Sequence, residues 1–73
     1  MWRRALPVKQ RVLLNLTNDR AINGILLRSI GDWLVLADAE LLEGAGRPRV
    51  MDGEIYVERE RVVFIQAAAP RGG

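Results

Sequence analysis

The sequence of 73 residues contains neither cysteine nor histidine. Without cysteine, disulfide bonds cannot hold a small chain together, and without both residue types a structural zinc site would need carboxylate ligands alone. These absences exclude a disulfide scaffold and a zinc ribbon. We therefore expect a fold that contains no metal site and needs no cofactor.

Long apolar runs are also absent. No stretch reaches the roughly 18 residues that a membrane-spanning helix needs, and residues 1–6 lead into Pro7 rather than into the apolar segment of a signal peptide. We expect a cytoplasmic protein without a membrane partner, although a component of a virus particle would fit the same pattern.

Net charge indicates little about function. Eleven basic residues against nine acidic ones leave a formal charge of +2, a small excess for a nucleic-acid-binding protein. No arrangement of histidine, cysteine or serine accompanies the carboxylates near the predicted loops to supply a base or a nucleophile. We therefore expect neither an enzyme nor a protein that binds a small-molecule substrate.

The small size of the chain favours self-association. A domain of this length buries only about 60 to 65% of the surface that its unfolded chain exposes. Apolar residues make up 49% of the chain and charged residues 27%, a balance typical of folded domains. Further copies would hide apolar area that the monomer cannot cover, so we expect a single domain over residues 1–73 that forms a homo-oligomer.

Short runs rich in valine, isoleucine and leucine, each bounded by turn formers, predict β-strands and no long helix. The predicted strands are residues 11–16, 21–28, 33–37, 54–58 and 62–65. Gly24, inside the second strand, predicts a bend. Five short strands in a flat sheet would leave one face uncovered, so we predict an all-β fold that is a small barrel or a strongly bent sheet.

The remaining segments are expected to lie outside the strands. Residues 40–52 hold two glycines and a proline and are expected to form one long variable loop, with strand extensions at most at its ends. Residues 1–10 and 67–73 are expected to be flexible.

The last two predicted strands carry the signal for an oligomer interface. Alternation over residues 54–58 places Ile55 and Val57 inward and Tyr56 outward. Residues 62–65 are apolar on both sides and contain no lysine or proline to discourage edge pairing. We predict that a second copy covers this edge. The predicted interface residues are Ile55, Tyr56, Val57, Val62, Val63, Phe64 and Ile65.

The order of these segments resembles the Sm-like family of small β-barrels. The resemblance covers residues 12–66 and rests on three stretches. The first comprises residues 12–16, the polar turn after them and Gly24 of the second strand. The second is residues 32–39, and the third comprises residues 53–57 with the three-residue turn and the strand that follow. It implies a five-stranded, strongly bent SH3-like barrel in which Gly24 and Gly53 have structural roles. It also implies that strand four of one subunit pairs with strand five of the next in a closed ring, most often a hexamer or heptamer.

The same resemblance implies binding of single-stranded RNA, with uridine or adenine bases held by the loop after strand two and the turn after strand four. Two departures fall on these loops. Trp33 stands where archaeal and eukaryotic members have the asparagine that reads a base edge. Glu58-Arg59 replaces their Arg-Gly pair and the Lys-His pair of the bacterial member. We therefore expect weak RNA binding with little sequence preference. The candidate RNA-binding residues are Asp32, Trp33, Arg59 and Arg61, with Arg3 and Arg4 from the basic N-terminal stretch.

Each candidate also has a plainer explanation. Trp33 could stack on a base, or it could fill the core or a subunit interface. Arg59 and Arg61 could reach phosphates, or they could form salt bridges in a solvated turn. The alternative to RNA binding is a ring-forming structural or adaptor protein, cellular or viral, that has lost base recognition. A monomeric SH3-like interaction module is a third interpretation.

Overall fold

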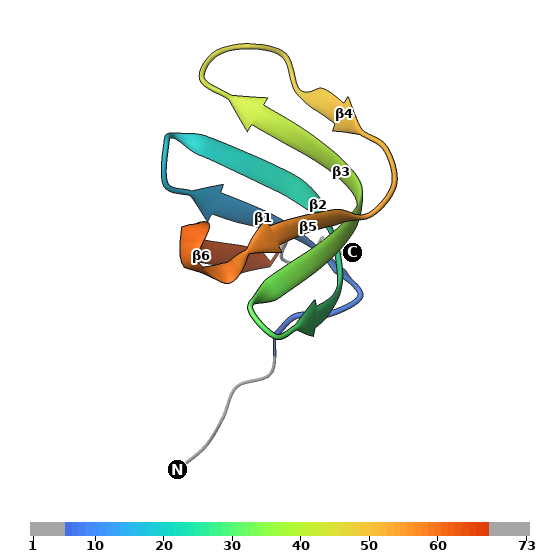
Figure 1. The fold of residues 1–73 in the computed structure, drawn as a ribbon. Helices are drawn as coiled ribbons and strands as arrows, with labels where there is room; N and C mark the ends of the chain where they lie inside the picture. Colours follow the sequence, from blue (N-terminus) through green and yellow to red (C-terminus); the bar gives the residue numbers. More distant parts are fainter. Residues whose placement is uncertain (1–5, 68–73) are drawn as a thin grey trace, which may run out of the picture.

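The computed structural model describes residues 6–67, which form a single antiparallel sheet of six strands and one short 3-10 helix (Figure 1). The elements are β1 (Gln10–Leu16), β2 (Arg20–Ile30), β3 (Trp33–Glu43), β4 (Arg49–Met51), β5 (Ile55–Glu58), η1 (Arg59–Arg61) and β6 (Val62–Ala67). This arrangement confirms the predicted all-β class. No helical segment in the described part of the chain is long and apolar enough to cross a bilayer.

The sheet is ordered β4-β3-β2-β1-β6, and β5 also pairs with β3. The long strand β3 serves two partners, because its first half (33–36) pairs with β5 and its second half (39–41) pairs with β4. In Figure 1 β3 accordingly curves from the turn after β2 up to the hairpin that leads into β4. Within residues 6–67 the sheet therefore has two free edges, one along β6 and the other along β4 and β5.

β2 passes close to β3 at Gly24, where the sequence predicts a bend. A Cβ added to Gly24 would lie 3.1 Å from the Cβ of Ala39 and 3.2 Å from the carbonyl oxygen of Ala37. The register between β2 and β3 also shifts between Asn23 and Ile25, on either side of this glycine. A side chain at this position would force Ala39 or the Ala37 carbonyl to move by a few tenths of an ångström, so glycine favours this close approach of the two strands.

Arg11 on β1 forms a salt bridge with Asp38, the residue of β3 that departs from extended backbone geometry. Asp38 has a φ of 52°, a conformation that aspartate tolerates better than most residues. One terminal nitrogen of Arg11 donates to Oδ2 of Asp38 at 2.5 Å, and the other donates to Oδ1 of Asn23 at 3.2 Å. The guanidinium thus ties three neighbouring strands together on the outer face of the sheet.

The core lies on the concave side of the bent sheet. Strand residues alternate between the two faces, so every second residue in the middle of β1 and of β2 points inward, whereas three consecutive residues of β3, Leu34 to Leu36, are all buried. The buried apolar residues are Val12, Leu14, Ile22, Leu26, Leu34, Val35, Leu36, Ala39 and Val57, and all of them except Val35 form one contiguous cluster. Among residues 6–67 no polar or charged residue is buried, so the core needs no internal hydrogen-bonding network.

The prediction of one long loop over residues 40–52 is wrong. β3 continues to Glu43 and Arg49–Met51 forms β4, so the loop between them comprises only residues 44–48. The reason is that Leu41 and Met51 both pack against the core, which favours strand over loop at those positions. The glycines and the proline that suggested a loop all fall within the short connection.

Residues 6–10, expected to be flexible, are instead held against the sheet. The backbone N–H of Lys9 donates to the carbonyl of Leu26 at 2.5 Å, and that of Val8 donates to the carbonyl of Leu6 at 2.8 Å. Leu6 also packs against the core. The expectation for residues 1–5 and 68–73 falls outside the described part of the chain.

We expect Gly24→Val to lower the free energy of unfolding by about 1 to 3 kcal/mol, because the new side chain must displace Ala39 or the Ala37 carbonyl. Urea denaturation at one fixed protein concentration measures the change. Gly46→Val is the matched control, since a Cβ there meets only the Glu43 carbonyl oxygen at 3.4 Å. An equal loss of stability in both variants would contradict the importance of the close approach at Gly24.

Candidate nucleic-acid interface

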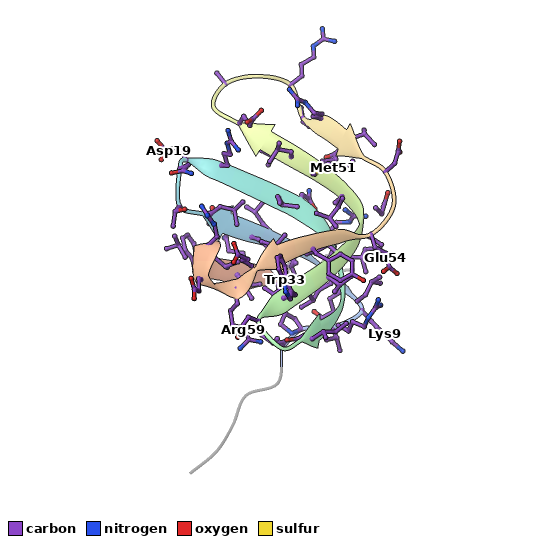
Figure 2. The ribbon with its side chains drawn as sticks, viewed as in Figure 1. Lys9, Asp19, Trp33, Met51, Glu54 and Arg59 are labelled. Atoms are coloured by element: carbon purple, nitrogen blue, oxygen red, sulfur yellow. The ribbon has the colours of Figure 1, made fainter. Side chains whose placement is uncertain are left out.

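The turn between β2 and β3 meets η1 at one end of the molecule. The backbone N–H of Arg59 donates to the carbonyl of Asp32 at 2.8 Å. The side chain of Arg59 also donates to Oγ of Ser29, at the end of β2, over 2.9 Å. Figure 2 shows Trp33 and Arg59 at this same end. The structure therefore brings together the two loops that the sequence associates with RNA.

Trp33 lies on the surface next to a second aromatic residue. Its ring is 6.4 Å from that of Tyr56 in an edge-to-face arrangement with an angle of 73°. The two residues are 43% and 50% exposed. This excludes the core explanation for Trp33 and leaves the base-stacking and subunit-interface explanations open. Sequence reasoning assigned Tyr56 to the interface alone, because its position beside Trp33 depends on the β3–β5 register.

The two arginines of the turn have different surroundings. Arg61 forms a salt bridge with Glu58, with 3.4 Å between Nε and Oε1. Arg59 forms no salt bridge within residues 6–67, and its contacts there are Ser29 and the backbone of Asp32. Because a carboxylate holds and partly neutralises Arg61, Arg59 is the better placed of the two to reach a phosphate.

The candidates also line two separate hollows, each of which includes one arginine of η1. Trp33, Tyr56 and Arg61 line a groove of about 330 Å³, together with apolar residues such as Ile55 from the free edge of β5. Arg59 lines a smaller hollow of about 260 Å³ with residues of β6. The sequence candidates Arg3 and Arg4 lie outside the described residues.

A salt bridge borders the aromatic pair on its other side. Arg28 donates to Oε1 of Glu54 at 3.0 Å, and this hydrogen bond raises the pKa of Arg28 above its ordinary value. The hydroxyl of Tyr56 also points to Oε1 of Glu54, at 3.5 Å. The carboxylate therefore orients both the arginine and the tyrosine, so that the tyrosine ring is held beside Trp33.

The predicted interface residues divide into inward-facing and exposed side chains. Val57 is buried in the core, while Ile55, Val62 and Ile65 are half-buried and pack against it. Tyr56 is half exposed, and Val63 and Phe64 are 62% and 53% exposed. The exposed side chains can contact a second copy directly, whereas the inward-facing residues can contribute only the backbone of their strands.

A bulge explains why two consecutive residues of β6 face outward. Asn15 of β1 pairs with Phe64, but the next residue, Leu16, pairs with Val62. Val63 is therefore the extra residue, and a bulge of this kind turns its side chain away from regular alternation. The free edge of β6 consequently displays two adjacent apolar side chains.

No protein-family model and no curated protein sequence matches the chain. Among solved structures, it is similar to the SmAP1 heptamer of P. aerophilum, with 30% identity, a TM-score of 0.75, and coverage of 86% of this chain and 84% of that one. It is also similar to the Pyrococcus abyssii Sm protein in complex with a uridine heptamer, with 24% identity, a TM-score of 0.73, and coverage of 84% and 86%. A chain of the NatC complex bound to CoA matches with 28% identity, a TM-score of 0.71, and coverage of 81% and 75%.

Proposed function

The chain belongs to the Sm-like family of small β-barrel proteins, and from this premise we propose that it forms a homo-oligomeric ring that binds single-stranded RNA weakly and with little sequence preference. The observation that carries the RNA part of the proposal is the exposed Trp33–Tyr56 pair at the same end of the molecule as Arg59, an arginine without a salt bridge in the described chain. Aromatic rings that stack on bases and arginines that reach phosphates are the usual elements of sequence-tolerant single-strand binding.

The two free edges of the sheet support assembly. A single chain leaves the backbone groups of β6 unpaired along one edge and those of β4 and β5 unpaired along the other. Pairing the β6 edge of one copy with the β5 edge of the next satisfies both, and a head-to-tail contact of this kind forms a closed ring when its rotation allows closure. The P. aerophilum neighbour is a heptamer, which supports a ring of similar size.

A ring would also strengthen RNA binding by repeating the site. Each subunit contributes one aromatic pair and one available arginine, so a strand that contacts several subunits gains affinity from each contact. The complex of the P. abyssii Sm protein with a uridine heptamer supports RNA as the ligand.

Binding is expected to be weak because two contacts typical of the family are missing. Trp33 stands in place of the asparagine whose amide would read a base edge, and Glu58-Arg59 stands in place of the family's Arg-Gly pair. The remaining contacts are stacking and electrostatic attraction, which depend little on base identity and strongly on salt.

The alternative is a ring-forming structural or adaptor protein without RNA. Two observations favour it. The chain resembles a component of the NatC complex, and five arginines of the described chain are already engaged by carboxylates. RNA binding by the purified ring separates the two functions, since the adaptor should bind no oligonucleotide even at about 50 mM salt.

We expect Phe64→Asp to dissociate the ring, because the substitution places a charge on the exposed apolar part of the β6 edge. Light scattering at micromolar protein concentration should then give the mass of a single chain. Val8→Asp is the matched control, since Val8 is also an exposed apolar residue but lies outside the strands. A monomeric unmodified chain, or an intact Phe64→Asp ring, would contradict assembly through β6.

We expect Arg59→Gln to weaken RNA binding and to flatten its salt dependence, with the slope of log K against log salt falling by roughly 0.7 for each lost phosphate contact. Titration of a uridine-rich and an adenine-rich oligonucleotide at several salt concentrations measures the slope.

Arg61→Gln is the matched control and should change the slope less, because Glu58 already engages Arg61. An equal effect of the two substitutions would contradict the distinction drawn between the arginines.

A further inference from the structure

Asn23 is followed directly by Gly24, and an asparagine before glycine is the one most prone to spontaneous loss of its side-chain amide. The backbone nitrogen of the second residue attacks Cγ of the asparagine. Glycine permits this attack because it has no side chain and few restrictions on its backbone. The other two asparagines of the chain, Asn15 and Asn18, precede leucine and aspartate, whose side chains hinder the same attack. The sequence therefore contains one reactive pair, which lies inside β2.

The fold holds the backbone of this pair in a conformation that opposes the attack. Ring closure requires the peptide group between Asn23 and Gly24 to rotate away from extended geometry, so that its nitrogen approaches Cγ. In β2 the backbone of Asn23 is kept extended by pairing with Leu13 of β1 on one side and Glu40 of β3 on the other. The close approach of β3 also leaves Gly24 little room to move.

The side chain of Asn23 is restrained as well. Its Oδ1 accepts a hydrogen bond of 3.2 Å from a terminal nitrogen of Arg11, and the other terminal nitrogen of Arg11 forms the salt bridge with Asp38. The asparagine is half-buried. Its amide must break the bond to Arg11 before it can turn toward the main chain, so the fold restrains both partners of the reaction.

From these restraints we propose that Asn23–Gly24 is a deamidation site that reacts in the unfolded chain and that folding silences. The Gly24 nitrogen forms a bond to Cγ of Asn23, the Cγ–Nδ2 bond breaks, and the amino group leaves as ammonia with the proton from the Gly24 nitrogen. One water molecule then opens the five-membered imide at either carbonyl. One opening restores the main chain as an aspartyl residue, and the other leads the main chain through Cγ as an isoaspartyl residue. The reaction depends on the folding of a single chain and not on RNA.

The two products differ in how they fit the sheet. An aspartyl residue keeps the length of the main chain and offers Arg11 a carboxylate in place of an amide oxygen. An isoaspartyl residue adds one methylene group to the main chain directly before Gly24, where β2 must match β1 and β3 at once. Even a Cβ added to Gly24 would lie only 3.1 Å from the Cβ of Ala39, so the longer main chain has little space. We therefore expect isoaspartyl chains not to refold, and chains that stay unfolded to be lost irreversibly.

Incubation in mildly alkaline buffer, with and without concentrated guanidinium chloride, compares the unfolded chain with the folded one. Trypsin releases Asn23 in the peptide 21–28 and the other two asparagines in the peptide 12–20, so mass spectrometry follows them separately. We expect Asn23 to be converted more than about tenfold faster in the unfolded chain, because the folded state opens rarely. The peptide 12–20 is the internal control and should change little in either condition. Equal rates for Asn23 in the two conditions would overturn protection by the fold, and an Asn23 that stays intact in the unfolded chain would overturn the site itself.

Refolding of partly converted chains tests the difference between the products. After the denaturant is removed, size-exclusion chromatography isolates the folded fraction, and its 21–28 peptides are compared with those of the whole sample. We expect the isoaspartyl peptide to be depleted from the folded fraction and the aspartyl peptide to be retained. Asn23→Asp is the matched control, since it carries the carboxylate on a main chain of normal length and should refold. An isoaspartyl peptide in the same proportion in both samples, or an Asn23→Asp chain that fails to refold, would overturn the role of the added methylene group.

Discussion

The close contact between β2 and β3 at Gly24 is the constraint on which the rest of the molecule depends. Because Gly24 has no side chain, β2 can lie against Ala37 and Ala39 where the sheet bends. The bend lets one half of β3 pair with β5 and the other half pair with β4. The curved sheet that results covers the hydrophobic core on its concave side. It also brings the turn that carries Asp32 against η1. A flat sheet of the same strands would leave the core open and separate the two turns.

Short apolar runs bounded by turn formers were sufficient to predict the class and most strands, and Gly24 was sufficient to predict the bend, because these depend on local pattern. The hairpin formed by the end of β3 and β4 was missed, since the two glycines and the proline of its short loop outweighed Leu41 and Met51, which are far apart in sequence. At the candidate site, the RNA-binding role of the two turns was predicted only through the family resemblance. The contact of Trp33 with Tyr56 follows from strand register, and the difference between Arg59 and Arg61 follows from the position of one carboxylate. Neither can be read from spacing along the chain.

Charge pairing determines how much of the basic composition is available to a partner. Five arginines within residues 6–67 are held by carboxylates, so the basic isoelectric point near 9.9 says little about the potential at any one place on the surface. Such exposed pairs add little stability, yet they occupy guanidinium groups. Arg59 donates to a serine hydroxyl instead, a neutral partner that competes less strongly with a phosphate than a carboxylate does. The RNA-binding and adaptor functions therefore differ in what one turn contacts, while both use the same fold.

The bulge at Val63 makes the two edges of the sheet chemically different. The β6 edge displays two adjacent apolar side chains, and the other edge consists of the short strands β4 and β5. When the β6 edge of one copy pairs with the β5 edge of the next, the copies form a head-to-tail chain. Every open chain of this kind, whatever its length, has an unpaired β6 edge at one end and an unpaired β4 and β5 edge at the other. Closing the chain into a ring pairs these two remaining edges with each other without bringing in another copy. The contact that closes the ring therefore stabilises the assembly more than any earlier contact. A protein that assembles in this way is divided at equilibrium between single chains and complete rings, and its rings appear over a narrow range of concentration rather than by gradual growth.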